Sequence, residues 1–238
     1  MGASALGLGL APGLTQVAEF AVNACRKIDG SAHSVASNLS ASVFSQGNQF
    51  SRKIALTFED GPTPVVTREI LAELKMRNLT ATFFVLGQRV LAEPDLTKQI
   101  KDEGHEIGSH GFSHSNFSML PTATIAQELE RTQEVVAQTT GIVPAWLRAP
   151  GVIPTLEHQT LAQNQNLNLA GWSVDSQDLA QADEKSIART ILNETRNGSI
   201  ILCHDLSQPT ARCIGEALDG LKARGFEFVT VSKLFAQA

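Results

Sequence analysis

From residue 53 to the end of the chain, apolar runs alternate with amphipathic stretches. The run IALTF at residues 54–58 is typical of a buried strand, and residues 64–78 place Val66, Ile70 and Leu74 on one face of a helix. The same alternation predicts further strands at 80–87, 105–110, 145–150, 167–175, 199–205 and 226–235. Helices are expected between them, in a stretch ending near Gly104 and at 125–141, 156–164, 184–198 and 211–225.

About seven strands alternating with helices predict an α/β domain in which helices wrap a parallel sheet. The strands are nearly continuous apolar runs, as expected when both faces of a sheet are buried. The strand count favours a distorted (β/α) barrel of about seven parallel strands. An open doubly wound sheet is the alternative, although no GxGxxG turn follows the first strand. Residues 1–50 are interpreted as an N-terminal extension or linker, and residues 51–238 as the folded domain.

The composition excludes several classes of protein. The 238 residues are 42% hydrophobic and 18% charged, which suits one sizeable domain. A formal net charge of -5 argues against a nucleic-acid partner held through phosphate contacts. No stretch approaches the roughly 18 apolar residues of a transmembrane helix. The apolar opening, residues 1–14, has no Lys or Arg before Arg26, so no convincing signal peptide is predicted. The oligomeric state is not indicated.

The three cysteines, Cys25, Cys203 and Cys213, form no CxxC pair and no metal-binding spacing. This argues against a thiolate zinc site. Cys203 lies inside an apolar run and is interpreted as a small buried residue. The sequence leaves open whether Cys25 and Cys213 form a disulfide.

Chemically active side chains stand at the carboxyl ends of the expected strands. They are Glu59 with Asp60, His110 with His114, Arg148, Asp175 with Asp178, and His204 with Asp205. In a β/α barrel these ends share the face on which active sites are built. Any one of them alone is more simply a helix cap or a structural hydrogen-bonding residue. Their joint placement predicts one shared polar site.

Asp60, His110 and His114 supply one carboxylate and two imidazoles. This set suits zinc or another divalent first-row metal with open coordination positions. Two adjacent carboxylates such as Glu59 and Asp60 repel each other when both are ionised, whereas a nearby metal ion allows both to keep their charge. The sequence therefore predicts a divalent metal, with Zn²⁺ favoured and Co²⁺ or Mn²⁺ as alternatives.

Five short motifs occur in a fixed order: TFEDGP at 57–62, HGFSH at 110–114, RAP at 148–150, DSQDL at 175–179 and LCH at 202–204. Together they resemble the motifs of the polysaccharide deacetylases of carbohydrate esterase family 4, the NodB homology domain. The resemblance covers roughly residues 51–238. It implies a metal-dependent hydrolase that removes N-acetyl groups from chitin-like or peptidoglycan-like amino-sugar polymers or oligomers, secreted or in the cell envelope.

The resemblance also implies residue roles, beginning with Asp60, His110 and His114 as the metal ligands. Glu59 would act as the general base and Arg148 would orient it. His204 would protonate the leaving amine, and Asp178 would set the charge and orientation of His204. The backbone N–H of Gly151 would help to hold the oxyanion. Leu179 and Leu202 would lie on the substrate side of the site.

Three positions depart from the family pattern. Glu59 stands where the family has an aspartate base, Gly151 where an aromatic residue is usual, and Leu179 where the fourth motif ends in tryptophan. The extra methylene of Glu59 moves its carboxylate by about 1.5 Å, and misplacement near 1 Å can cost about a hundredfold in rate. A catalytically impaired homologue that binds sugar is therefore one alternative. A hydrolase of a small non-sugar amide is another.

Overall fold

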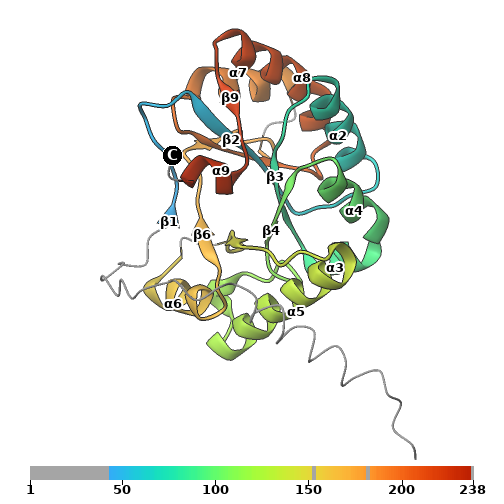
Figure 1. Ribbon diagram of the computed structural model, residues 1–238, viewed down its shortest axis with the longest axis vertical. Helices are drawn as coiled ribbons and strands as arrows, with labels where there is room; N and C mark the ends of the chain where they lie inside the picture. The colour runs from blue at the N-terminus through green and yellow to red at the C-terminus, as the bar shows by residue number, and fades with distance from the viewer. Residues whose placement is uncertain (1–42, 152–153, 181–182, 237–238) are drawn as a thin grey trace, which may run out of the picture. The chain divides into compact units, whose positions relative to one another are not determined.

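The computed structural model describes residues 43–151, 154–180 and 183–236 (Figure 1). The strands are β1 Val43–Phe44, β2 Lys53–Glu59, β3 Thr82–Val85, β4 Glu106–Ser109, β5 Trp146–Leu147, β6 Asn168–Ala170, β7 Val174–Asp175, β8 Ile200–His204 and β9 Glu227–Phe228. The α-helices are α2 Val66–Met76, α3 Gly87–Ala92, α4 Pro94–Asp102, α5 Thr122–Thr140, α6 Leu156–Asn164, α7 Glu184–Glu194, α8 Gln208–Ala223 and α9 Val231–Phe235. A short 3₁₀ helix, η2, spans Phe117–Met119.

The strands form one parallel sheet in the order β1-β6-β5-β4-β3-β2-β8-β7, and β9 pairs with the start of β2. Only residues 171–173 separate β6 from β7, yet these strands lie near opposite ends of this order. The sheet must therefore curl until its two ends approach, as the ring of strands in Figure 1 shows. This confirms the predicted α/β class and the distorted barrel. In the described part of the chain this order contains eight strands, where about seven were expected.

The expected strand at residues 167–175 is wrong as a single element, because the chain leaves the sheet in its middle. The N–H of Gly171 donates to the carbonyl of Phe44 at 2.9 Å, and the carbonyl of Gly171 accepts from Arg148 at 3.0 Å. A Cβ at position 171 would lie 2.4 Å from Oγ of Ser45, so glycine is needed there. The pattern therefore divides into β6 and β7.

The expected strand at residues 226–235 is also wrong over most of its length. Only β9 is extended, and the chain then turns into α9. The side chain of Thr230 accepts a hydrogen bond from the N–H of Lys233, which caps the first turn of α9. The N–H of Val231 donates to Thr82, the first residue of β3. Helix α9 therefore lies at the amino ends of the strands.

Successive strand residues face two different apolar regions. The outward side chains of β2, β3 and β8 pack into one large cluster with the helices; among them are Leu56, Phe58, Phe83 and Cys203. The inward side chains form a second cluster with α9, which contains Ala55, Phe84, Trp146, Ile200 and Leu234. Because this second cluster fills the amino-terminal part of the interior, polar inward side chains can gather only at the carboxyl ends.

The sheet begins ahead of residue 51. Strand β1 pairs in parallel with β6, and Phe44 packs edge-to-face against Trp146 at 5.4 Å between ring centroids. The end of the segment assigned to an extension therefore contributes to the sheet. Residues 1–42, including Cys25, lie outside the described residues, while Cys203 and Cys213 are buried. No helix in the described part of the chain is both long enough and apolar enough to cross a membrane.

Candidate active site

Glu59 ends β2 and Asp60 follows it with a backbone φ of 76°, in the left-handed region. Along β2, Ala55, Thr57 and Glu59 face the interior because strand side chains alternate. The left-handed turn at Asp60 interrupts this alternation, and aspartate is among the residues that tolerate it. Both carboxylates are thereby buried at the same edge of the sheet, with 8% and 7% of their surface exposed.

The turn after Asp60 is held by Asp205, the residue after β8. Oγ1 of Thr67 donates to Oδ2 of Asp205 at 2.7 Å, and the N–H of Asp205 donates to the carbonyl of Glu59 at 3.1 Å. A Cβ at Gly61 would lie 1.9 Å from Oδ2 of Asp205, so no larger residue fits. Burial raises the pKa of Asp205 to about 7. Asp205 therefore acts on the site through the backbone of the turn.

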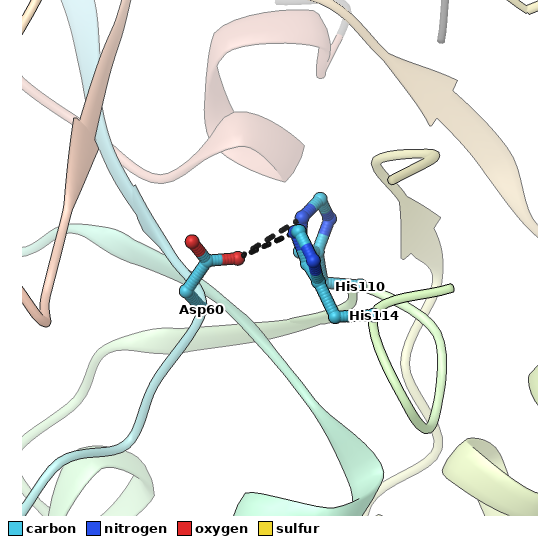
Figure 2. A group of neighbouring side chains, drawn as sticks. All are labelled: Asp60, His110 and His114. Carbon is cyan, nitrogen blue, oxygen red and sulfur yellow. Dashed lines mark ion pairs between the residues drawn. The ribbon is translucent and has the colours of Figure 1, made fainter. Parts of the chain in front are cut away.

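Asp60, His110 and His114 converge on one point (Figure 2). Oδ1 of Asp60 lies 3.3 Å from Nε2 of His110 and 3.1 Å from Nε2 of His114. One possible ligand atom from each residue lies within 4.8 Å of the others. Burial alone would raise the pKa of Asp60, but the two imidazoles bring it well below its usual range, so the carboxylate is ionised.

These residues fit a divalent metal ion. Oδ1 of Asp60 and Nε2 of His110 are buried and make no hydrogen bond within the described residues, which is costly for polar atoms without a ligand. Nδ1 of His110 lies 2.7 Å from the carbonyl of Arg148, which orients the ring and leaves Nε2 toward Asp60. The side chain of His114 is 45% exposed, so the cluster has an open side.

Glu59 lies between a cation and an imidazole. Its Oε2 is 3.3 Å from Nη1 of Arg148, and its Oε1 is 3.2 Å from Nε2 of His204 and 3.8 Å from Nε2 of His110. Burial would raise the pKa of Glu59, but the surrounding imidazoles and the guanidinium lower it to about 2. Glu59 is therefore a carboxylate in ion-pair contact with both Arg148 and His204.

Arg148 is the largest fully buried side chain in the described residues, with 1% of its surface exposed. Its guanidinium donates to Oγ1 of Thr57 at 2.9 Å and to the carbonyl of Gly171 at 3.0 Å, and it lies over the ring of Phe84 at 4.3 Å. Removing a charged group from water is expensive unless it is paired and hydrogen-bonded. This cage therefore fixes the cation that faces Glu59.

His204 ends β8 and is held by Asp178. Nδ1 of His204 lies 2.7 Å from Oδ1 of Asp178, and Oδ2 of Asp178 accepts from the backbone N–H of His204 at 2.8 Å and from Thr210 at 2.5 Å. Burial would lower the pKa of His204, but its hydrogen bond with Asp178 and its contact with Glu59 raise the pKa to about 10. At neutral pH His204 is therefore an imidazolium that can donate a proton.

The elevated pKa of His204 predicts a pH-dependent stability in the metal-free protein. Below pH 6.5 the histidine is protonated in both folded and unfolded chains, so its ion pairs stabilise the fold fully. From pH 6.5 to about 10 the unfolded chain loses this proton while the folded chain keeps it, so the contribution decreases. Urea unfolding of the wild type and His204→Gln across this range should give a stability difference that shrinks as the pH rises; a constant difference would contradict the assignment.

The other predicted residues lie around this centre. Leu202 is buried in β8 on the same side as His204, two residues away. Leu179 follows β7 and is 57% exposed. Gly151 lies in the turn after β5 with a φ of 66°, and its carbonyl accepts from Asn116 at 3.4 Å. Asp175 caps the following turn through the N–H of Gln177 at 2.8 Å. The substrate-side roles of Gly151, Leu179 and Leu202 remain predictions.

Sequence reasoning missed three supporting residues. Thr57 accepts from Arg148, and Thr210 donates to Asp178. Glu128 accepts from the N–H groups of residues 112 and 113, which lie between the two histidines of the Asp60 cluster. In the sequence, Thr57 fits the pattern of a strand residue, and Glu128 and Thr210 fit the pattern of helix residues. None of the three carries a further signal of a functional role. Only the strand register, which pairs Thr57 with Leu202 on β8, indicates that Thr57 faces the site.

Comparison with known proteins supports the family resemblance of the five sequence motifs. A family model described as polysaccharide deacetylase matches residues 46–170. The peptidoglycan-N-acetylglucosamine deacetylase PgdA of Listeria monocytogenes is 35% identical over 187 residues, which are 78% of this chain and 39% of that protein. A chitooligosaccharide deacetylase of Bradyrhizobium sp. is 30% identical over 198 residues, which are 77% of this chain and 90% of that protein.

A solved structure agrees in fold. The crystal structure of a Bacillus anthracis protein, described as a carbohydrate esterase family 4 pseudoenzyme, superposes with a TM-score of 0.79 at 23% identity, over 83% of this chain and 70% of that one. At this identity the likeness concerns the fold alone. The chain spans 39% of the Listeria relative, whereas it spans most of the Bradyrhizobium one. The family model covers more than half of the residues, so the chain belongs to the polysaccharide deacetylase family.

Proposed function

We propose that this chain is a metal-dependent hydrolase that removes N-acetyl groups from amino-sugar polymers or oligomers. The observation that carries the proposal is the Asp60, His110 and His114 cluster, which lies beside a carboxylate in contact with an imidazolium. The relatives named for peptidoglycan and chitooligosaccharides supply the substrate class. We place the protein where such polymers occur, in the cell envelope or the secreted space.

The first chemical step needs a base and a polarised carbonyl. Asp60, His110 and His114 would hold a divalent ion, which when bound would supply Lewis acidity toward water and the acetyl carbonyl. Glu59 takes a proton from the attacking water while the water oxygen bonds to the carbonyl carbon. Arg148 keeps Glu59 ionised and fixes its orientation. The backbone N–H of Gly151 is proposed to hold the developing oxyanion.

The second step needs an acid. His204 gives the proton on Nε2 to the amine nitrogen as the carbon–nitrogen bond breaks, so acetate and a free amino sugar leave. Asp178 binds Nδ1 of His204 and therefore determines which nitrogen faces the substrate. After the product leaves, proton exchange with solvent returns His204 to the imidazolium and Glu59 to the carboxylate.

The test is acetate release from N-acetylglucosamine oligomers by metal-depleted protein and by protein restored with Zn²⁺, Co²⁺ or Mn²⁺. Release only after metal is restored supports the proposal. Equal release with and without metal contradicts the metal dependence. Binding of the oligomer without acetate release under any metal contradicts the hydrolase and favours an impaired sugar-binding homologue.

The impaired homologue is favoured by one observation, the reach of Glu59. Its longer side chain brings Oε1 to 3.2 Å from Nε2 of His204, while Oε2 remains at 3.3 Å from Arg148. Glu59, the proposed base, thus faces the proton on Nε2 of His204, which is the proton that His204 must donate to the leaving amine. An aspartate is shorter by one methylene, about 1.5 Å, and would leave His204 free to meet a leaving amine.

Glu59→Asp is therefore expected to raise the rate of acetate release by roughly tenfold or more, because the base withdraws from His204 and makes room for substrate. Metal affinity should change little, since Glu59 is outside the proposed ligand set. Steady-state acetate release and metal content would be measured on both proteins. Glu227→Asp, the same change at an exposed position on β9, serves as the control and should leave the rate unchanged. A lower rate in Glu59→Asp would show that the pocket is adapted to glutamate.

A further inference from the structure

A basic cavity lies at the edge of the sheet opposite the candidate active site. Its volume is about 500 Å³, and its walls are Gln46, Gln49, Arg52, Arg196, Asn197, Arg224 and Phe226. These residues precede β2, β8 and β9, so the cavity is at the amino ends of these strands. Glu59 and His204 are at the carboxyl ends of β2 and β8. The cavity is therefore separate from the deacetylase site.

Two of the three guanidinium groups that line this cavity share a backbone acceptor, and the third donates to the main chain of Arg224. Nη1 of Arg196 at 2.9 Å and Nη2 of Arg224 at 3.3 Å both donate to the carbonyl of Thr195. Nη1 of Arg52 donates to the carbonyl of Arg224 at 2.6 Å. Like charges held this close repel each other, and each favours a neighbouring anion.

The described residues provide no carboxylate to neutralise this cluster. None of Arg52, Arg196 and Arg224 makes an ion pair within them, whereas Arg77 and Arg212 on other parts of the surface are each paired with an acid. The protein has a net charge of -5, so acidic side chains are plentiful elsewhere. The cluster is a local concentration of unpaired positive charge on an acidic protein.

The hydrogen bonds of all three arginines are to the C-terminal ends of helices, but they leave other donors of these arginines unused. Arg196 and Arg224 donate to carbonyls at the C-terminal end of α7, where cations are favourable. Arg52 donates to the carbonyl of Arg224, the C-cap residue of α8. Each guanidinium has five N–H donors, and these contacts use only one or two of its nitrogens. Donors therefore remain for a ligand.

The walls of the cavity are held in place. Nε2 of Gln46 donates to the carbonyl of Asn197 at 3.2 Å, and Nδ2 of Asn197 donates to the carbonyl of Gln49 at 3.0 Å. Arg224 lies over the ring of Phe226 at 5.2 Å. These contacts join the loop before β2 to the loop before β8, so the arginines are arranged before any ligand arrives.

We propose that this cavity binds a phosphate group. Arginine forks match phosphate and carboxylate oxygens, but three forks need more acceptor atoms than the two oxygens of one carboxylate. A phosphate monoester or a pyrophosphate offers three or more terminal oxygens and more than one negative charge, which suits all three arginines. A phosphodiester polymer has two free oxygens and one charge at each phosphate, so it would need two neighbouring phosphates to do the same, and the two sources are separated by experiment.

The experiment is calorimetric titration of inorganic pyrophosphate and, separately, of a glycerol phosphodiester oligomer into the metal-free protein at low ionic strength. Saturable binding with one site per chain is expected for at least one probe. Arg52→Gln and Arg196→Gln should each weaken it by about tenfold or more. Arg89→Gln, an exposed arginine on α3, and His110→Ala, at the other end of the sheet, should leave it unchanged.

The outcomes separate the sources and test the site. Binding of pyrophosphate alone assigns the cavity to a free phosphate compound, and binding of the oligomer alone assigns it to a polymer. Absence of saturable binding by either probe overturns the proposal, as does unchanged affinity in Arg52→Gln. Arg52 and Arg196 donate to the ends of different helices, α8 and α7, so a loss of binding in both variants does not come from damage to a single helix end.

Discussion

Replacing His110 by alanine is expected to abolish stoichiometric metal binding and to lower acetate release by about a thousandfold. Three protein ligands hold a catalytic metal, and removing one leaves only Asp60 and the half-exposed His114. A bound metal ion would supply several kcal/mol of transition-state stabilisation, and about 4 kcal/mol corresponds to a factor of a thousand. Metal content by mass spectrometry of the purified protein and the rate of acetate release are the two measurements.

The control must separate metal loss from damage to Arg148, since Nδ1 of His110 contacts the Arg148 carbonyl. His114→Ala serves this purpose because the ring of His114 forms its ion pair with Asp60, and that ion pair does not involve the Arg148 carbonyl. A second control is His158→Gln at the start of α6, where glutamine can keep the capping box with Thr155. This variant should retain metal and activity. Full metal content in both His110→Ala and His114→Ala would show that the ligand set is wrong.

The second large effect is expected for His204→Asn, which should slow acetate release by at least a hundredfold while metal content stays normal. General acid catalysis by a positioned side chain contributes about a hundred- to ten-thousandfold, and asparagine cannot supply the proton. Metal binding should persist because Nε2 of His204 faces Glu59 rather than the Asp60 cluster. The rate at saturating substrate should fall much more than the affinity for the substrate.

The leaving group offers a sharper test of this role. An amine must be protonated as it departs, whereas the nitrophenolate of 4-nitrophenyl acetate leaves without a proton. His204→Asn should therefore lose far less activity toward the aryl acetate than toward N-acetylglucosamine oligomers. Equal losses on both substrates would mean that His204 acts on structure or binding, and an unchanged rate on the oligomers would remove it from the mechanism. Asp178→Asn should also lose more activity toward the oligomers than toward the aryl acetate, but by a smaller factor. The reason is that this variant weakens the contact by which Asp178 orients the His204 ring.

The periodic pattern predicted the parallel sheet because β2, β3 and β8 are buried on both faces and therefore read as apolar runs. It failed at residues 167–175, where the apolar character continues although the chain leaves β6, next to one end of the sheet order, and enters β7 at the other end. Alternation shows which side chains are buried, not which neighbour a strand pairs with. It failed again at Thr230, where a side-chain cap redirects an apolar stretch into α9.

The candidate site was predicted to a larger extent than the strand boundaries. Parallel strands align their carboxyl ends, so residues far apart in sequence, such as Asp60 and His204, are expected at the same edge of the sheet once the fold class is known. The direct contact between Glu59 and His204 could not be predicted, because it depends on a side-chain reach of one methylene. The same holds for the cage around Arg148, which uses a backbone carbonyl at Gly171 and an unremarkable strand threonine.

The pairing of β2 with β8 has a consequence for the order in which the protein can mature. Thr57 hydrogen-bonds the carbonyl of Ile201 across a separation of 144 residues, and the same ladder places Glu59 opposite His204. Contacts this distant in sequence raise the contact order and slow folding. During synthesis β2 emerges long before β8, so one of its edges stays unpaired and prone to aggregation until β8 has been made. Glu59 and His204 therefore come together only after β8 has been made, and a product truncated before β8 lacks this contact.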